Sequence, residues 1–206
     1  MKSKWEEIQQ DIWDCTACKN VARAELNIRQ QTEPIRTSTK LLVVGIAPPY
    51  KDGMTQKVQA RSATNDPGDN FRNFIETVLE LPWDTLKGSG LVFLHAVKCA
   101  IRPEDRHQNP PSGVVETCAP RHFYREFLEI KPKAVISFGE RARRAVLKMP
   151  GCQKPRGLKL SGPLTGQHEM LLESHTFTLF VSPFFLADYR QAEETLRAAA
   201  LYAEII

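Results

Sequence analysis

Four short runs of consecutive apolar residues constrain the fold of this chain more than any other feature. They lie at 41–45, 91–97, 134–138 and 177–181. Continuous apolar runs of strand length are typical of strands buried on both faces, as in a parallel sheet. Segments with helical periodicity separate them, so the sequence predicts strand–helix alternation and an α/β fold with helices on both faces of the sheet.

The helical segments are recognised by apolar residues at spacings of three and four. In 69–81, for example, Phe71, Phe74, Ile75 and Val78 recur on one side. We expect further helices at 3–14, 113–130, 140–147 and 188–203. Residues 19–39 are expected to form a loop with a short helix, 51–68 and 100–112 long loops, and 149–169 a loop-rich stretch with room for a hairpin. The interpretation is a single domain over 1–206 with four parallel strands.

Composition narrows the class of protein. Hydrophobic residues make up 42% and charged residues 25% of the 206 residues, as in ordinary globular proteins. No apolar run reaches about 18 residues, and the charged N-terminus lacks the apolar core of a signal peptide. We therefore expect a soluble cytoplasmic protein. Its net charge of +4 permits a polyanionic partner without requiring one.

Five cysteines suggest a metal site. Cys15 and Cys18 form a C-x2-C pair at the end of the first helix, whereas Cys99 ends a strand and Cys118 lies in a helix. In a reducing compartment these are not expected to be disulfides, and four thiolates suit a [4Fe–4S] cluster or a zinc ion. The long separation of the last two favours the larger cluster. The alternative is unrelated buried thiols, and Cys152 is interpreted as a bystander.

In parallel α/β sheets, ligands bind beyond the carboxyl ends of the strands. These ends carry Gly45-Ile-Ala-Pro48, Val97-Lys-Cys99, Phe138-Gly139 and Ser182-Pro-Phe-Phe-Leu186. Together with the C-x2-C pair, Cys118 and Arg190, their order and spacing resemble the uracil-DNA glycosylase superfamily, in particular its iron–sulfur classes, families four and five. The resemblance covers nearly the whole chain.

The resemblance implies a three-layer α/β/α sandwich around a mostly parallel four-stranded sheet. It implies a monomeric DNA-repair hydrolase that flips a deaminated base, uracil or another, out of DNA in base excision repair. It also implies a structural [4Fe–4S] cluster that ties the N-terminal helix to the core. By the resemblance, its ligands are Cys15, Cys18, Cys99 and Cys118.

The same resemblance assigns catalytic residues. In one class of the family a glutamate follows the glycine of the first motif, where this chain has Ile46. The other class is thought to use a later aspartate as the general base. By this resemblance, Asp69 is the first candidate for the general base and Asp66 the second. The alternative is that Asp69 only caps a helix. Ser182 replaces a histidine that stabilises the departing base, and as a hydroxyl it is a weaker donor.

Further positions of the resemblance form the base pocket and the DNA contacts. His95 replaces an asparagine that reads uracil, and Phe71 is the candidate for stacking on the base; a structural histidine and ordinary core packing are the alternatives. The pocket would comprise Gly45, Ile46, Ala47, Pro48, Phe71 and His95. Candidate wedge and backbone contacts are Pro183, Phe184, Phe185, Leu186 and Arg190. Additional basic candidates are Arg102, Arg106, His107, Arg141, Arg143 and Arg144.

Three other functions stay open at this point. The replacements at Ile46, His95 and Ser182 favour a non-catalytic nucleic-acid-binding protein of the same fold. A hydrolase of free modified nucleosides would act on small substrates and would not need DNA. A protein stapled by zinc would be colourless, whereas an iron–sulfur protein is brown.

Overall fold

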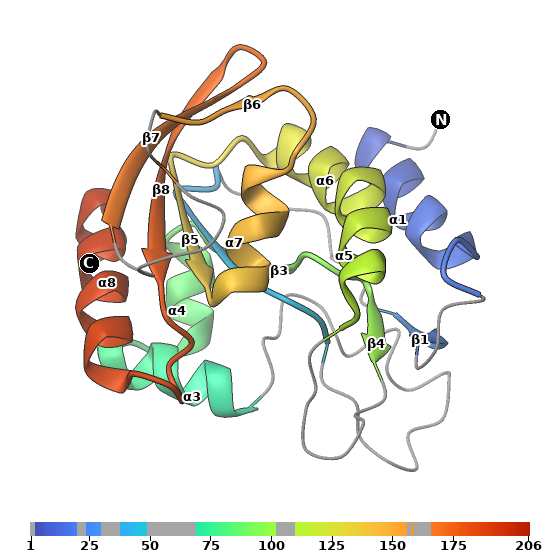
Figure 1. Ribbon diagram of the computed structural model, residues 1–206. Helices are drawn as coiled ribbons and strands as arrows, with labels where there is room; N and C mark the ends of the chain where they lie inside the picture. The colour runs from blue at the N-terminus through green and yellow to red at the C-terminus, as the bar shows by residue number, and fades with distance from the viewer. Residues whose placement is uncertain are drawn as a thin grey trace.

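The main sheet contains the four parallel strands that the apolar runs predict. A computed structural model describes residues 3–19, 24–29, 38–48, 69–101, 110–155, 158 and 166–206. In these residues the parallel strands pair in the order β3-β2-β5-β8 (Figure 1). Their bounds are β2 Leu41–Gly45, β3 Leu91–His95, β5 Ala134–Phe138 and β8 His175–Ser182. Their residues are largely buried, as continuous apolar sequence requires.

The sheet is wider than the expected four strands. In the described part of the chain it has six, because β7 (Gly166–Leu172) pairs antiparallel with β8 and β6 (Cys152–Gln153) pairs antiparallel with β7. The region expected to be loop-rich thus supplies a hairpin strand. Its sequence, GQHEMLL, hides the strand because most of its residues remain at least partly exposed, so no continuous apolar run is present.

A separate two-stranded ribbon lies beside the main sheet. Here β1 (Ala24–Arg29) pairs antiparallel with β4 (Cys99–Ile101). The expectation of a loop and short helix over 19–39 is therefore wrong at 24–29, where the backbone forms a strand. Likewise, the expected loop at 100–112 begins with strand residues. The second strand of the ribbon, β4, begins at Cys99, shortly after the end of β3.

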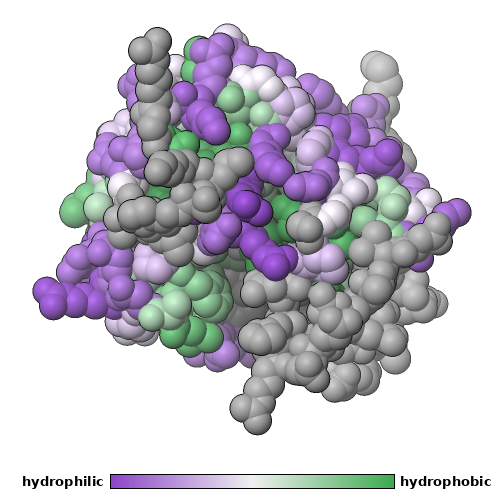
Figure 2. All heavy atoms as spheres, in the orientation of Figure 1, coloured by the Kyte–Doolittle hydropathy of each residue, from purple (hydrophilic) through white to green (hydrophobic). Residues whose placement is uncertain are grey.

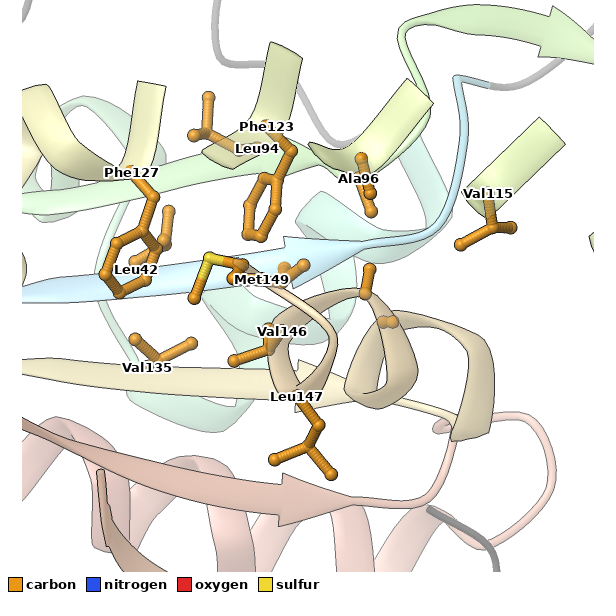
Figure 3. Packing of buried hydrophobic residues seen from close by; sticks show 14 of the residues in the cluster. Leu42, Leu94, Ala96, Val115, Phe123, Phe127, Val135, Val146, Leu147 and Met149 are labelled. Atoms are coloured by element: carbon orange, nitrogen blue, oxygen red, sulfur yellow. The ribbon is translucent and has the colours of Figure 1, made fainter. Parts of the chain in front are cut away.

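Helices cover both faces of the main sheet, which confirms the layered α/β architecture (Figure 1). One face packs against α3 (Asp69–Leu79), α4 (Trp83–Gly88) and α8 (Tyr189–Tyr202). The other packs against α5 (Ser112–Cys118), α6 (Tyr124–Ile130) and α7 (Glu140–Leu147). On this second face Phe127 points towards Leu42 of the sheet, and Phe123 points towards Met149 (Figure 3).

The first helix, α1 (Lys4–Asp14), lies outside this second layer, beside α6. Ser3 begins it with a capping box: the Ser3 hydroxyl accepts from the backbone N–H of Glu6, and the Glu6 carboxylate accepts from the N–H of Ser3. Ile8 and Ile12 are buried against the domain. The helix ends at Cys15, so packing of α1 fixes the position of the C-x2-C pair.

The segment between α5 and α6 is a π-helical turn, Ala119–Phe123. The backbone N–H of Tyr124 donates to the carbonyl of Ala119, five residues earlier. The three elements form one continuous helical run in place of the single helix expected over 113–130. Such π turns are rare and occur frequently at functional sites.

No helix of the described residues is long and apolar enough to cross a membrane. On the face shown in Figure 2, hydrophobic side chains form small separate areas between hydrophilic ones.

Candidate functional site

The carboxyl ends of the parallel strands bring three of the sequence candidates to one edge of the sheet. Gly45 is paired in register with His95 on the neighbouring strand. Ser182 is paired with Phe138, and its carbonyl accepts a hydrogen bond from the N–H of Gly139 at 2.9 Å. Since β2 pairs with β5, all four parallel strands end at the same edge of the sheet. The arrangement matches the position expected for a ligand site in this fold.

Gly45 is required by close approach of its neighbours. A Cβ atom at this position would lie 2.7 Å from Cζ of Phe93 and 3.1 Å from Cδ2 of His95. The chain then turns outward: the N–H groups of Ala96 and Val97 donate to the carbonyls of Gly45 and Ile46 at 2.9 and 2.8 Å. The residues from Ile46 to Pro48 are half-buried in this turn, so they line the edge without being enclosed.

His95 is buried and its ring packs edge-on against Phe93, with centroids 4.7 Å apart. Burial, and secondarily the charge of Lys98, holds the pKa of His95 well below its usual range. The imidazole is therefore neutral at pH 7. In that form it offers one N–H donor and one acceptor nitrogen.

Ser182 is fully buried at the end of β8. Its hydroxyl donates a hydrogen bond to the carbonyl of Pro183 at 2.9 Å. A serine hydroxyl has a single proton to donate. In this conformation, that proton is not directed to a ligand.

Phe71 lies in a cluster of aromatic rings below the strand ends. Its centroid is 4.9 Å from that of Phe138, 5.3 Å from Phe185 and 5.4 Å from Phe93. The ring is buried, which favours the core-packing interpretation for this residue. The cluster forms a rigid aromatic wall between α3 and the sheet edge.

The loop after β8 separates its apolar residues into buried and exposed ones. Pro183 is buried, and Phe185 stacks on Phe74 with centroids 4.8 Å apart and an interplanar angle of 15°. Phe184 is 41% and Leu186 73% exposed. Of the predicted wedge residues, these two therefore project from the surface. A buried neighbour anchors them.

The charged candidates near this edge differ in accessibility. Asp69 is exposed in the first turn of α3, where the helix dipole favours a carboxylate. Arg190 is exposed in the first turn of α8 and pairs with Glu194 at 3.1 Å. Other candidates lie outside the described residues, namely Asp66, Arg102, Arg106 and His107.

The three arginines of α7 do not form one basic surface. Arg143 is buried, so the expectation that it contacts phosphates is wrong. Arg141 and Arg144 are half-buried, and Arg144 pairs with Glu140 at 3.3 Å. Of the three, only these two remain accessible for a phosphate.

The four cysteines named as ligands converge on one pocket, although they come from distant parts of the sequence. Cys15 and Cys18 follow α1, Cys99 begins β4, and Cys118 ends α5. None of the four forms a disulfide. The remaining lining residues include the cationic Lys98 and Arg121 and the imidazole of His122. Cys152, the bystander, is not among the residues that line this pocket.

Burial dominates the electrostatics of the thiols. It raises the pKa of Cys118 to about 12, with a smaller opposing effect of the N–H that Lys98 donates to its sulfur at 3.3 Å. Burial likewise raises the pKa of Cys18, and the Cys15 thiol adds to the shift. Metal binding displaces such protons and couples the affinity to pH.

The four cysteines are the donor set that two kinds of metal site use. Four thiolates bind either a structural zinc ion or an iron–sulfur cluster. Among the described residues, no group of three or more His, Cys, Asp or Glu side chains is already arranged to hold a single metal ion.

A buried ion pair lies beside this pocket, and no sequence motif indicates it. Lys98 and Glu126 form a salt bridge with side chains 1% and 0% exposed. Gln9 of α1 donates to Oε1 of Glu126 at 3.0 Å, so the pair joins the β3 end, α6 and the first helix. In the sequence, Glu126 is next to Phe127, which is a core residue. A charged residue next to the core-facing positions of a helix is the one signal that could have indicated a buried ion pair.

A comparison with protein families identifies a match. The sequence model of the uracil DNA glycosylase superfamily matches residues 34–201. No curated protein matches significantly. The matched span includes all four parallel strands and their carboxyl ends.

Proposed function

Because the chain belongs to the uracil DNA glycosylase superfamily, we propose that it removes a deaminated base from DNA in the first step of base excision repair. Membership implies a DNA glycosylase-like role. The observation that carries the finer proposal is that Gly45, His95 and Ser182 end their strands at the same sheet edge, beside exposed Phe184 and Leu186. Ligands bind at this edge in parallel α/β sheets, and a base-flipping enzyme also needs a projecting side chain to fill the space of the flipped base.

The neutral imidazole of His95 is proposed to read the edge of the flipped base. One donor and one acceptor suit a base that presents both, such as uracil or hypoxanthine. The half-buried Ile46, Ala47 and Pro48 would exclude water from one side of the base. Phe71 supports the pocket from the aromatic wall.

Hydrolysis of the N-glycosidic bond follows from the accessible carboxylate. Asp69 is proposed to orient a water molecule whose oxygen bonds to C1′ while the bond from C1′ to the base nitrogen breaks. The electron pair of that bond leaves with the base, and the water gives up one proton to Asp69. Backbone N–H groups stabilise the departing anion. Ser182 would have to turn its hydroxyl from Pro183 to contribute.

DNA contacts are proposed for the loop after β8. Leu186 and Phe184 would fill the space that the flipped nucleotide leaves in the duplex. Arg190, at the exposed start of α8, would contact a phosphate after releasing Glu194. A monomer suffices for this mode of binding.

A [4Fe–4S] cluster is proposed at the cysteine pocket, in line with the iron–sulfur classes of the family. Its ligands would be the four pocket cysteines, Cys15, Cys18, Cys99 and Cys118. They fit it because four thiols share one pocket, whose lining also includes the cationic Arg121. When bound, the cluster supplies cross-linking rather than a reaction step. It would join the end of α1 to β4 and α5.

The test is a strand-cleavage assay on anaerobically purified full chain. End-labelled oligonucleotides contain one uracil, hypoxanthine or xanthine, single- or double-stranded, and alkali reveals abasic sites. The Asp69→Asn variant should lose turnover and keep DNA affinity. Asp84→Asn is the matched control, because Asp84 is an exposed aspartate in the first turn of α4. Full activity of Asp69→Asn would refute the assigned role.

A non-catalytic DNA-binding role is the second candidate. The inward hydroxyl of Ser182 and the apolar Ile46 favour it. It predicts binding of the same oligonucleotides without release of any base. A positive cleavage assay excludes it, and release from free nucleosides alone would point to a nucleoside hydrolase.

A further inference from the structure

His122 is a buried polar residue that the proposed glycosylase chemistry does not use. It lies in the π-helical turn four residues after Cys118, and its side chain is 2% exposed. Neither ring nitrogen has a hydrogen-bond partner among the described residues. Buried polar groups are paired in the great majority of cases, so this one requires an explanation.

The surroundings of His122 indicate what its partner would be. The imidazole lines the same pocket as the four cysteines. The charged side chains that act on it are mainly cations: Lys98, Arg121 and Arg125, opposed by Asp11. Lys98 is paired with Glu126, and Arg125 with Asp11. Thiolate-bound iron–sulfur clusters carry sulfurs that can accept a hydrogen bond from an imidazole N–H.

We propose that an imidazole N–H of His122 donates a hydrogen bond to a sulfur of the bound cluster and thereby stabilises its reduced form. The proposal rests on the cluster proposed above. It concerns a positioning residue that is distinct from the four cysteine ligands. It also explains why a histidine is found in a helix turn that otherwise packs the apolar Ala119 and Phe123 against the core.

The direction of the effect follows from charge. Reduction adds an electron to the cluster, and a hydrogen-bond donor stabilises the more negative state more strongly. Hydrogen bonds to the sulfurs are one of the factors that set the potential of such clusters. Removing the donor should therefore lower the reduction potential and loosen the cluster.

The experiment uses the full chain, purified without oxygen, with iron and acid-labile sulfide measured first. His122→Leu removes both ring nitrogens at similar volume, and His122→Gln restores an N–H donor. His168→Leu is the matched control, because His168 is in β7 and does not line the pocket. The readouts are the reduction potential, the electron paramagnetic resonance spectrum of the dithionite-reduced protein, and the rate of iron loss to a chelator.

We expect His122→Leu to bind the added electron about tenfold more weakly, a shift of about 59 mV to lower potential, and to lose iron several-fold faster. His122→Gln should lie nearer the unsubstituted protein, and His168→Leu should match it. A four-iron cluster with unchanged potential and unchanged iron loss in His122→Leu overturns the proposal. So does a change of cluster type in that variant, since it would make His122 a ligand.

If His122→Leu does not fold, the unsubstituted protein labelled with ¹⁵N-histidine provides the second measurement. A hydrogen-bonded imidazole gives a weak coupling between the ¹⁵N nucleus and the unpaired electron in the electron paramagnetic resonance spectrum of the reduced cluster. Absence of this coupling overturns the proposal. A preparation without iron and sulfide overturns the cluster itself, together with the role of His122. Base release is not a readout here, so failure of the glycosylase proposal is distinguishable.

Discussion

The buried pair of Lys98 and Glu126 should be strongly coupled in stability. The perturbation is a double-mutant cycle with Lys98→Met, Glu126→Gln and the double substitution. Each single change leaves one buried charge without its counter-ion. The double change leaves none, and the amide introduced by Glu126→Gln still has an oxygen to accept the hydrogen bond from Gln9. We therefore expect two costly single variants and a far milder double variant.

The loss of unfolding free energy is limited by the cost of neutralising the charge that is left without a counter-ion. Any lysine ammonium loses its proton at pH 7 at a cost of about 4.6 kcal/mol, and any glutamate gains one for about 3.7 kcal/mol. These values are ceilings, because the group neutralises rather than remain charged in the interior. The Lys98 ammonium also lies 5.9 Å from the Phe123 ring centroid, a weak additional contact. Losses of about 3 kcal/mol, up to these ceilings, are expected for the single variants.

The same argument gives the two single variants opposite pH dependences. A buried lysine without a counter-ion is neutral when folded and charged when unfolded, so its cost shrinks as the pH rises. A buried glutamate without a counter-ion is neutral when folded and charged when unfolded, so its cost grows as the pH rises. Each changes by about 1.4 kcal/mol per pH unit. Glu126→Gln should therefore recover stability from pH 6 to 8.5, whereas Lys98→Met should lose it.

The assay is anaerobic urea unfolding followed by far-ultraviolet circular dichroism, at equal metal content in all four proteins. A double variant within about 2 kcal/mol of the starting protein supports the coupling. If the double loss equals the sum of the single losses, or if both single variants respond to pH in the same direction, the reasoning about this pair is wrong.

Four further outcomes follow from the candidate site. Gly45→Ala should cost about 1–3 kcal/mol of unfolding free energy, since the new Cβ would lie 2.7 Å from Cζ of Phe93; thermal unfolding measures it. The pKa of His95 is lowered by burial in the folded state, so the unfolded chain binds more protons and stability falls as the pH drops below about 6.5; His95→Gln should flatten urea midpoints measured from pH 7.5 to 5.5. Phe185→Ala should cost about 3–5 kcal/mol, because it removes a buried ring and leaves a cavity beside Phe74. Leu186→Ala should leave the melting temperature unchanged and weaken base removal from duplex DNA only. Equal stability losses in Phe185→Ala and Leu186→Ala would contradict the interpretation that Phe185 is buried in the core and Leu186 projects from the surface.

Much of the fold could be predicted because burial on both faces of a strand leaves a local pattern in the sequence. The runs at 41–45 and 134–138 coincide with β2 and β5, since a strand covered on both faces needs apolar residues at every position. By contrast, β7 lies near the sheet margin and keeps polar residues, so its local sequence resembles a loop. The strand β1 likewise depends on its pairing with β4, which no local pattern encodes.

The position of the candidate site could be predicted from the sequence, but the directions of its side chains could not. Gly45, His95 and Ser182 each follow or end a predicted strand, and the ends of parallel strands lie at the same edge of a sheet. Three consecutive apolar residues after Pro183 could not be told apart until packing on α3 showed that Phe185 points inward. The same difficulty applies to the faces of α7, where the expected phosphate contact of an arginine proved wrong. The link of a lysine at the end of β3 to a glutamate of α6 depends on tertiary packing between segments that share no motif.

The π turn between α5 and α6 makes this helical run sensitive to its length. Each residue of an α-helix advances the side-chain direction by about 100°, so the wider turn at Ala119–Phe123 resets the angular phase between Cys118 and the residues of α6. Deleting a single residue there would restore a regular helix and rotate α6 by that amount. Glu126 would turn away from Lys98 and Phe127 away from the sheet, while Cys118 kept its place. One inserted residue therefore allows the same helix to serve the cysteine pocket and the hydrophobic core.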